Sequence, residues 1–269
     1  MSACHAVAGF CQPDGVTGVR DQDDDTYQLV LLDLFPLYSE LPSLTLKPTH
    51  RRVTHLAHGW CMRVHRGIEV VLLLCDSGYA VESWPIRRSV LEHLVGLKWL
   101  AQDGNRAVDP IVRELGRQAT RRLNAVTTAG WKAAADPTFR VAIADGQAAN
   151  ADLELDTYLA FKHRCDKYGS AHDWASYLIE THNSHPGWET AAPYVAQGPS
   201  MTMLWDPEPI DRDDEGWAAM KLWETDAVMR LMMEDPPDDW ETVLESTQKR
   251  IMRLSGQDSD SAEPDSGRQ

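Results

Sequence analysis

The sequence predicts an all-α protein, a multi-helix bundle built around a central apolar helical hairpin. Apolar residues recur at spacings of three and four along most of the chain, which places them on single helix faces. There is no series of alternating strand patterns and no internal repeat. The most apolar stretch, residues 51–103, has the pattern of two long helices joined at Asp76-Ser77-Gly78-Tyr79. Helices this apolar are typical of the centre of a bundle.

The chain before the hairpin predicts an acidic leader and one short helix. Residues 1–25 are rich in glycine and small residues and end in an acidic run, a composition typical of disorder. Residues 27–41 predict an apolar helix that is interrupted at Pro36, because proline cannot donate to the helical backbone ladder. A connector over residues 42–49 leads into the hairpin.

The two hairpin helices carry polar groups on otherwise apolar surfaces. In the first helix, His58, His65 and Glu69 lie roughly opposite an apolar stripe, whereas Arg88 and Glu92 lie four residues apart on the second, residues 81–101. A buried, isolated charge costs several kcal/mol, so Arg88 and Glu92 must pair if that face is buried. Two interpretations stay open: a structural ion pair, or a polar site in an apolar pocket. The stripe consists of Val53, Leu56, Trp60, Val64, Ile68, Val71 and Cys75.

Several helices are expected after the hairpin. Asp109-Pro110 is typical of a helix start, and Ser170-Ala-His-Asp173 resembles a capping box whose helix ends by Pro186-Gly187. One domain over residues 26–254 results, followed by a disordered acidic tail at 255–269. The other expected elements are a helix over 109–126, an irregular connection over 130–150 with room for a short helix, a helix over 153–168, a long packed loop over 188–212, and helices over 213–234 and 238–254.

The charge distribution and the cysteine content limit the possible partners and the cellular compartment. The net charge is −15, yet residues 51–125 carry twelve Lys and Arg against seven Asp and Glu. RNA or another anion on this basic face therefore stays open as a partner, although the tryptophan-rich part at 201–254 is acidic. The five cysteines form no C-x-x-C pair, and Cys61 and Cys75 lie on an apolar stripe as small hydrophobes. With no apolar run long enough to span a membrane, these features predict a cytoplasmic protein without a membrane partner.

Standard cofactor motifs are absent from the sequence. It contains no phosphate-binding P-loop, no dinucleotide-binding glycine pattern, no nucleophile elbow and no Glu-x-x-His of a helical di-metal site. His65-x-x-x-Glu69 and His182-x-x-His185 could each offer two metal ligands, but pairs at this spacing are common on helix surfaces. We therefore predict no metal and no cofactor.

Some residues match a nuclease pattern. Helical, metal-independent ribonucleases of the HEPN superfamily carry Arg-x(4 to 6)-His, and this chain resembles them in that pattern. On a helical wheel, however, His93 points about 140° away from Arg88. The matches are Arg88-x4-His93, Arg87-x5-His93, Arg51-x6-His58 and Arg52-x5-His58.

A second resemblance covers about residues 50–195. Arg88-Ser89-x-x-Glu92 follows an apolar helix and a glycine turn, and Ser184-His185-Pro186 comes near a later helix end, after Tyr177. This arrangement resembles a bacterial family known as domain of unknown function five-six-seven-seven, with Thr181 where a serine is usual. The resemblance implies an all-α domain and implies no activity.

Together these patterns give one site hypothesis. We expect Arg88, Glu92 and His185 to meet in the bundle interior as candidate catalytic groups, since a carboxylate beside a histidine suits acid–base work or anion recognition. The expected binding residues around them are His65, Glu69, Tyr177, Thr181 and His182.

Three functions follow from that hypothesis. The first is a helical module that binds a small ligand or protein partner in a bacterial defence or regulatory setting. The second is a HEPN-like ribonuclease or toxin, in which Arg88 and a histidine converge on an open positive cleft, usually across a homodimer. The third is a structural protein, in which Arg88 and Glu92 are fully buried with no pocket beside them. Whether the protein is an enzyme stays open.

Overall fold

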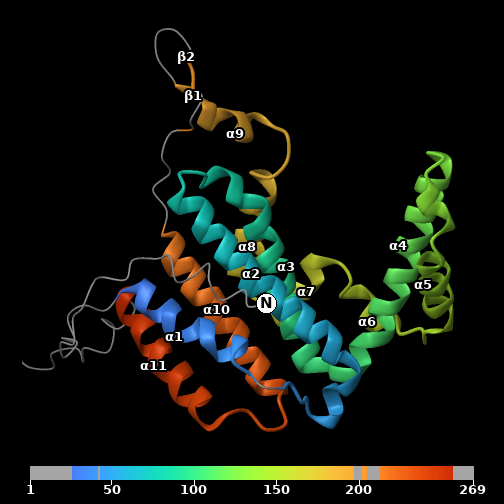
Figure 1. Cartoon of the computed structure of the whole chain (residues 1–269), viewed down its shortest axis with the longest axis horizontal. Coiled ribbons are helices and arrows are strands. Elements are labelled where there is room, and N and C mark those ends of the chain that lie inside the picture. The colour runs from blue at the N-terminus through green and yellow to red at the C-terminus, as the bar shows by residue number, and fades with distance from the viewer. Residues whose placement is uncertain (1–25, 42, 197–201, 205–206, 208–212, 257–269) are drawn as a thin grey trace, which may run out of the picture.

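The computed structural model is all-α, as the sequence predicts, and it describes residues 26–41, 43–196, 202–204, 207 and 213–256 (Figure 1). The predicted leader at 1–25 and the tail from 257 onward lie outside these residues. The central hairpin consists of α2 (Thr54–Asp76) and α3 (Trp84–Asp103), which pack against each other along their length. Gly78 has a φ of 82° in the connecting turn, a conformation that glycine adopts without a Cβ penalty.

Three helices lie on one side of the hairpin (Figure 1). α10 (Asp214–Met232) packs against α2 and α3, whereas α1 (Tyr27–Ser39) and α11 (Asp238–Leu254) pack mainly against α10 and against each other. The main hydrophobic core lies between these helices and the hairpin, with Trp99 and Trp240 fully buried. The helix of α1 continues through Pro36, so the predicted interruption is wrong. Pro36 lies one turn before the end of the helix, where it removes only one backbone bond.

Two short helices cover the other side of α3. α7 (Phe161–Tyr168) and α8 (Ala171–His182) pack against α3, and the predicted capping box at Ser170 and Asp173 opens α8. The single helix expected over 153–168 is instead α6 (Leu153–Thr157) and α7, separated by a turn. The less regular apolar pattern of this stretch agrees with that division.

The helices α4 (Val108–Thr128) and α5 (Pro137–Ala148) pair with each other and project from the bundle (Figure 1). The sequence predicts an irregular connection over 130–150 with room for a short helix, and α5 is a regular helix of 12 residues within that stretch. Leu115, on the apolar stripe of α4, is 46% exposed. The helices instead meet at Gly116 and Gly146, where an added Cβ on Gly116 would lie 2.9 Å from Gly146 Cα. Because α5 makes this contact through Gly146 and not through large apolar side chains, its sequence shows no clear hydrophobic periodicity.

Of the loop predicted over 188–212, residues 188–196, 202–204 and 207 are described, and the others lie outside the described residues. The described part contains α9 (Trp188–Ala191) and a two-residue antiparallel pairing of β1 (Val195–Ala196) with β2 (Thr202–Met203). Trp188 is 66% exposed, so this tryptophan is not packed as predicted. Among the described residues, no helix is sufficiently long and apolar to cross a membrane.

Candidate functional site

Arg88, Glu92 and His185 meet at the surface between α3 and the end of α8. Arg88 Nε donates to Glu92 Oε1 at 3.2 Å, and Arg88 Nη1 donates to His185 Nε2 at 3.2 Å. The Arg88 guanidinium also lies 5.1 Å from the ring centroid of Tyr177. The Arg88 and Glu92 side chains are 28% and 36% exposed, so the expected location in the bundle interior is wrong. The three predicted side chains do come together, but water reaches them.

Local sequence explains how these groups are positioned. Arg88 and Glu92 are four residues apart on α3, a spacing that places side chains next to each other on a helix. The capping box fixes where α8 begins, and the helix ends at His182, three residues before His185. Thr181 Oγ1 is buried and accepts or donates no hydrogen bond within the described chain, whereas His182 is exposed.

An aromatic group continues the site along α7 and α8. The rings of Phe161 and Tyr177 have centroids 4.1 Å apart, and the Trp174 and Tyr177 rings are stacked at 5.6 Å. Lys162 Nζ lies 5.4 Å from the Trp174 ring, and the Arg164 guanidinium lies 5.6 Å from the Phe161 ring. We call this region the α3/α7/α8 surface, and it comprises Arg88, Glu92, Phe161, Lys162, Arg164, Trp174, Tyr177 and His185.

Arg164 is the least solvated cation of this surface. Burial lowers the pKa of its guanidinium, although the nearby Glu92 carboxylate opposes that effect. Its Nε is buried and donates no hydrogen bond within the described residues. No motif in the sequence singles out Arg164, because its position depends on how α7 packs against α3.

The HEPN-like pattern is only partly assembled. His93 Nδ1 donates to the backbone oxygen of Ser89 at 2.6 Å, and its ring packs edge-on against Trp60. Burial lowers the pKa of His93, and Arg63 and Arg164 lower it further, although the Ser89 and Glu92 oxygens oppose this. The histidine beside Arg88 is therefore His185, from the turn that follows α8. The remaining matches are used elsewhere, with Arg51 paired to Glu234, Arg52 to Asp109 and His58 to Tyr38.

The fully buried arginine of α3 is Arg87. Arg87 Nε donates to Glu180 Oε1 at 2.9 Å, Arg87 Nη1 pairs with Asp214, and the guanidinium lies 3.9 Å from the Trp217 ring centroid. These contacts join α3 to α8 and α10. The residue that we predicted in the bundle interior is Arg88, which lies one residue and about 100° away around the helix.

A second group of buried charges also joins α3, α8 and α10. Lys221 Nζ lies 3.2 Å from Asp173 Oδ1 and 2.8 Å from Glu224 Oε1, while Lys98 Nζ contacts the same two carboxylates at 3.4 and 2.5 Å. Two cations and two anions balance, which is how charges are tolerated in an interior. We regard the Arg87 and Lys221 groups as framework that holds α8 on α3 and α10.

His65 and Glu69 do not join the Arg88 group. His65 is buried on a side of α2 that faces α1 and α10, where His65 Nε2 lies 2.8 Å from Asp226 Oδ1. Glu69 is exposed on the surface of α2. Cys61 also belongs here, because one potential ligand atom from each of Cys61, His65 and Asp226 lies within 4.8 Å of the others. We predicted that His65 lies opposite the apolar stripe of α2. The structure shows that this side of the helix is partly buried.

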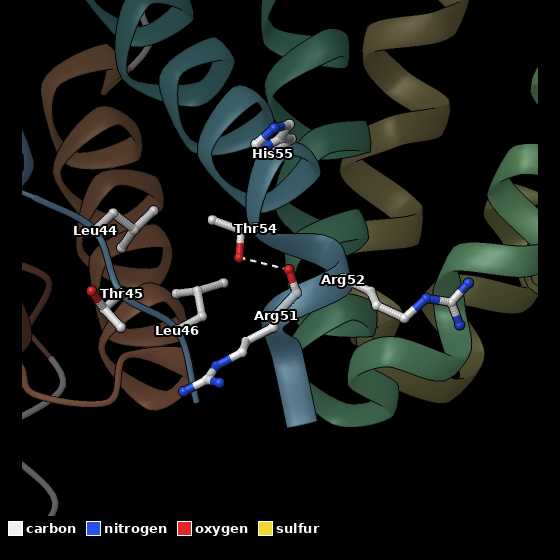
Figure 2. Close-up of a pocket in the computed structure, with 7 residues that line it drawn as sticks. All are labelled: Leu44, Thr45, Leu46, Arg51, Arg52, Thr54 and His55. Carbon is white, nitrogen blue, oxygen red and sulfur yellow. Dashed lines mark hydrogen bonds between the residues drawn. The ribbon is translucent and has the colours of Figure 1, made fainter. Parts of the chain in front are cut away.

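A shallow open pocket lies at the start of α2 (Figure 2). Thr54 Oγ1 donates to the backbone oxygen of Arg51 at 2.9 Å, and Figure 2 shows the side chains of Arg51 and Arg52 extending in different directions. Both guanidinium groups have carboxylate partners, Glu234 and Asp109. The pocket is lined by Leu44, Thr45, Leu46, Arg51, Arg52, Thr54 and His55.

Comparison with known proteins assigns no family. No protein-family model matches the chain, and no curated protein or solved structure matches it. The resemblances to domain of unknown function five-six-seven-seven and to HEPN nucleases therefore stay predictions.

Proposed function

We propose that this protein is a binding module whose α3/α7/α8 surface takes an anionic ligand with a planar ring, such as a nucleotide or single-stranded RNA. The observation that carries the proposal is the Arg88 guanidinium, which Glu92 and His185 hold against the face of Tyr177. A cation beside stacked aromatic rings is the arrangement by which proteins bind the phosphates and bases of single strands.

The chemistry of each group fits this role. An arginine has five N–H donors, and Arg88 uses Nε and Nη1 in the two bonds to Glu92 and His185. Its remaining donors can meet a phosphate in the paired geometry that guanidinium groups favour. Trp174 and Tyr177 are half-buried, so part of each ring is exposed for stacking. Lys162 adds positive charge beside the Trp174 ring, and Arg164 adds it beside the Phe161 ring.

A titration of purified protein with single-stranded RNA and with nucleotides, followed by tryptophan fluorescence, tests the proposal. Stacking of one base contributes about 1–3 kcal/mol, so Tyr177→Leu should weaken binding about fivefold or more. Arg88→Ala should weaken it and reduce its salt dependence. Arg122→Ala, at an exposed position on α4, is the matched control and should bind as wild type does. Equal affinities for Arg88→Ala, Tyr177→Leu and wild type would refute the proposal.

A second candidate function is metal-independent RNA cleavage, and the contact between Arg88 Nη1 and His185 Nε2 favours it. Histidine can move a proton while arginine stabilises charge on the phosphodiester. Cleavage that persists in EDTA and is lost in folded Arg88→Ala and His185→Ala would support a HEPN-like ribonuclease or toxin. RNA binding without cleavage would support only the first proposal, that of a binding module. This second function also proposes a homodimer that completes the cleft.

The third expectation required Arg88 and Glu92 to be fully buried. Their exposures of 28% and 36% do not meet that condition, so we do not favour a purely structural role for them. A cytoplasmic setting is part of the proposal, supported by the free thiols of Cys61, Cys75 and Cys165. A role in bacterial defence or regulation rests on the family resemblance alone.

A further inference from the structure

A buried cluster of one thiol, one imidazole and one carboxylate lies between α2 and α10, away from the α3/α7/α8 surface. Cys61 and His65 are four residues apart on α2, so they lie on one face of the helix, and Asp226 faces them from α10. One potential ligand atom of each lies within 4.8 Å of the other two, and all three residues are buried. We propose that Cys61, His65 and Asp226 form a binding site for a divalent metal ion of the zinc class.

The distances permit such a site with small movements. Zinc binds sulfur at about 2.3 Å and nitrogen or oxygen at about 2.0–2.2 Å, so tetrahedral ligand atoms are about 3.3–3.8 Å apart. Atom pairs near the 4.8 Å limit must therefore close by about 1 Å, whereas His65 Nε2 and Asp226 Oδ1 must separate by about 0.5 Å, and side-chain rotation can supply both movements. His65 Nε2 and Asp226 Oδ1 are 2.8 Å apart, so a metal bound by both takes the place of the proton they share.

The charges and the ligand atoms of this cluster determine which class of ion it binds. A thiolate, a neutral imidazole and a carboxylate together carry two negative charges, which a divalent cation neutralises. That neutralisation removes the cost of burying the fully enclosed Asp226 carboxylate. Thiolate and imidazole favour zinc and its transition-metal neighbours over magnesium or calcium, which prefer oxygen ligands.

Asp226 supplies an independent indication of a missing partner atom. Its Oδ2 is buried and accepts no hydrogen bond from any described residue, although buried carboxylate oxygens are nearly always paired. Burial raises the pKa of Asp226, and His65 only partly opposes that effect. A bound cation would satisfy Oδ2 directly.

The same three residue types could also form a nucleophilic triad, but the environment argues against that. Cys61 is completely inaccessible to solvent, so no substrate reaches it. Burial, with the Asp226 carboxylate, raises the pKa of the Cys61 thiol, whereas a nucleophilic cysteine needs a lowered pKa. Metal binding removes this difficulty because the cation itself stabilises the thiolate.

Tyr38 and His58 connect the cluster to solvent. The Tyr38 ring centroid lies 5.6 Å from that of His65, and the Tyr38 hydroxyl is 2.7 Å from Nδ1 of the exposed His58. Both residues carry atoms that can bind a metal. Zinc in a tetrahedral site needs a fourth ligand, which water or a neighbouring side chain such as Tyr38 would supply.

Cobalt(II) provides a direct test, because its bond to a thiolate gives a near-ultraviolet charge-transfer band. Wild-type protein should bind one equivalent of cobalt(II) with this band, zinc should displace the cobalt, and zinc should raise the melting temperature. Cys61→Ser should abolish the band, and Asp226→Asn should weaken binding more than the 10–100-fold typical of losing a group behind a ligand. A wild-type protein that gives no band overturns the proposal without reference to any variant.

Matched variants identify which thiol binds. Cys75→Ser removes another thiol of α2 that lies outside this cluster, and a Cys4→Ser/Cys11→Ser double variant removes the two N-terminal thiols. The band should persist in both. A band that persists in Cys61→Ser, or that is lost with Cys4 and Cys11, overturns the proposal.

Discussion

Asp173 is the residue whose charge holds α8 in place. Its carboxylate contacts Lys221 Nζ at 3.2 Å and Lys98 Nζ at 3.4 Å, and its Oδ2 accepts the backbone N–H of Ser170 at 3.0 Å. Asp173→Asn keeps an oxygen for the cap and removes only the charge. The Lys221 side chain is 2% exposed, so the variant leaves two cations in a buried site with one carboxylate, Glu224.

We expect this loss to lower the free energy of unfolding substantially. Breaking a buried ion pair costs about 3–5 kcal/mol. Because Lys221 and Lys98 both keep Glu224, the lower end, about 3 kcal/mol, applies to Asp173→Asn. The urea midpoint should fall by about 1 M or more with little change in the m-value. A decrease below about 1 kcal/mol in the free energy of unfolding would refute the assignment of this group as framework.

Two controls isolate the charge. Asp166→Asn removes the carboxylate of an exposed pair with Lys162, and exposed pairs contribute well under 1 kcal/mol. In a double-mutant cycle, Lys221→Met should make the loss of Asp173 less costly, because the two residues then no longer interact. Additive effects of the two changes would contradict the direct contact seen between them.

The effect should also depend on pH. Burial alone would raise the pKa of Asp173, but Lys221 and Lys98 outweigh burial, and the pKa lies below its ordinary value. A carboxyl group with a lowered folded-state pKa stabilises the fold above its unfolded pKa of about 3.9, and this contribution disappears as pH falls through the folded-state value. The difference between wild type and Asp173→Asn should therefore be complete at pH 7 and shrink in acid.

Three further changes test other parts of the fold. Arg87→Met leaves the buried Glu180 carboxylate without its 2.9 Å partner and should cost about 3–5 kcal/mol in chemical denaturation, whereas Arg88→Ala at the half-exposed neighbouring position should cost far less. Gly116→Ala places a Cβ 2.9 Å from the Gly146 backbone and should speed hydrogen exchange in α5; unchanged exchange would contradict the close glycine contact. Gly59→Ala, where no atom lies within 4 Å of the new Cβ, should raise the melting temperature because alanine favours helix by up to about 1 kcal/mol.

The predictable parts of this fold are those encoded by local pattern. The central hairpin follows from dense apolar spacing, and the start of α8 follows from a capping box at Ser170 and Asp173. The extent of α5 could not be predicted because this helix packs through Gly146, which leaves no apolar stripe. The buried arginine was assigned to Arg88 instead of Arg87, since both lie on a helix that is apolar on most sides and only tertiary packing decides which one is enclosed.

Contacts between residues distant in the chain could not be predicted from spacing. His65 and Asp226 are 161 positions apart, and no local motif relates them. Cys61-x-x-x-His65 was a usable signal, because it places two metal-binding atoms on one helix face, but Cys61 also fits an apolar stripe. A thiol on a buried stripe has the same pattern whether it packs or binds a metal.

Two consecutive arginines of α3, Arg87 and Arg88, differ in how much of each side chain is exposed. Arg87 is enclosed by Glu180, Asp214 and Trp217, so its bonds are already made in the folded protein. Arg88 is held from one side by Glu92 and His185 but remains accessible, so it can exchange a partner without unfolding α8. This difference makes Arg88→Ala an informative binding variant and Arg87→Met an uninformative one. If ligand affinity depends on Arg88 and the free energy of unfolding depends on Arg87, then ligand binding and stabilisation of the fold belong to different arginines.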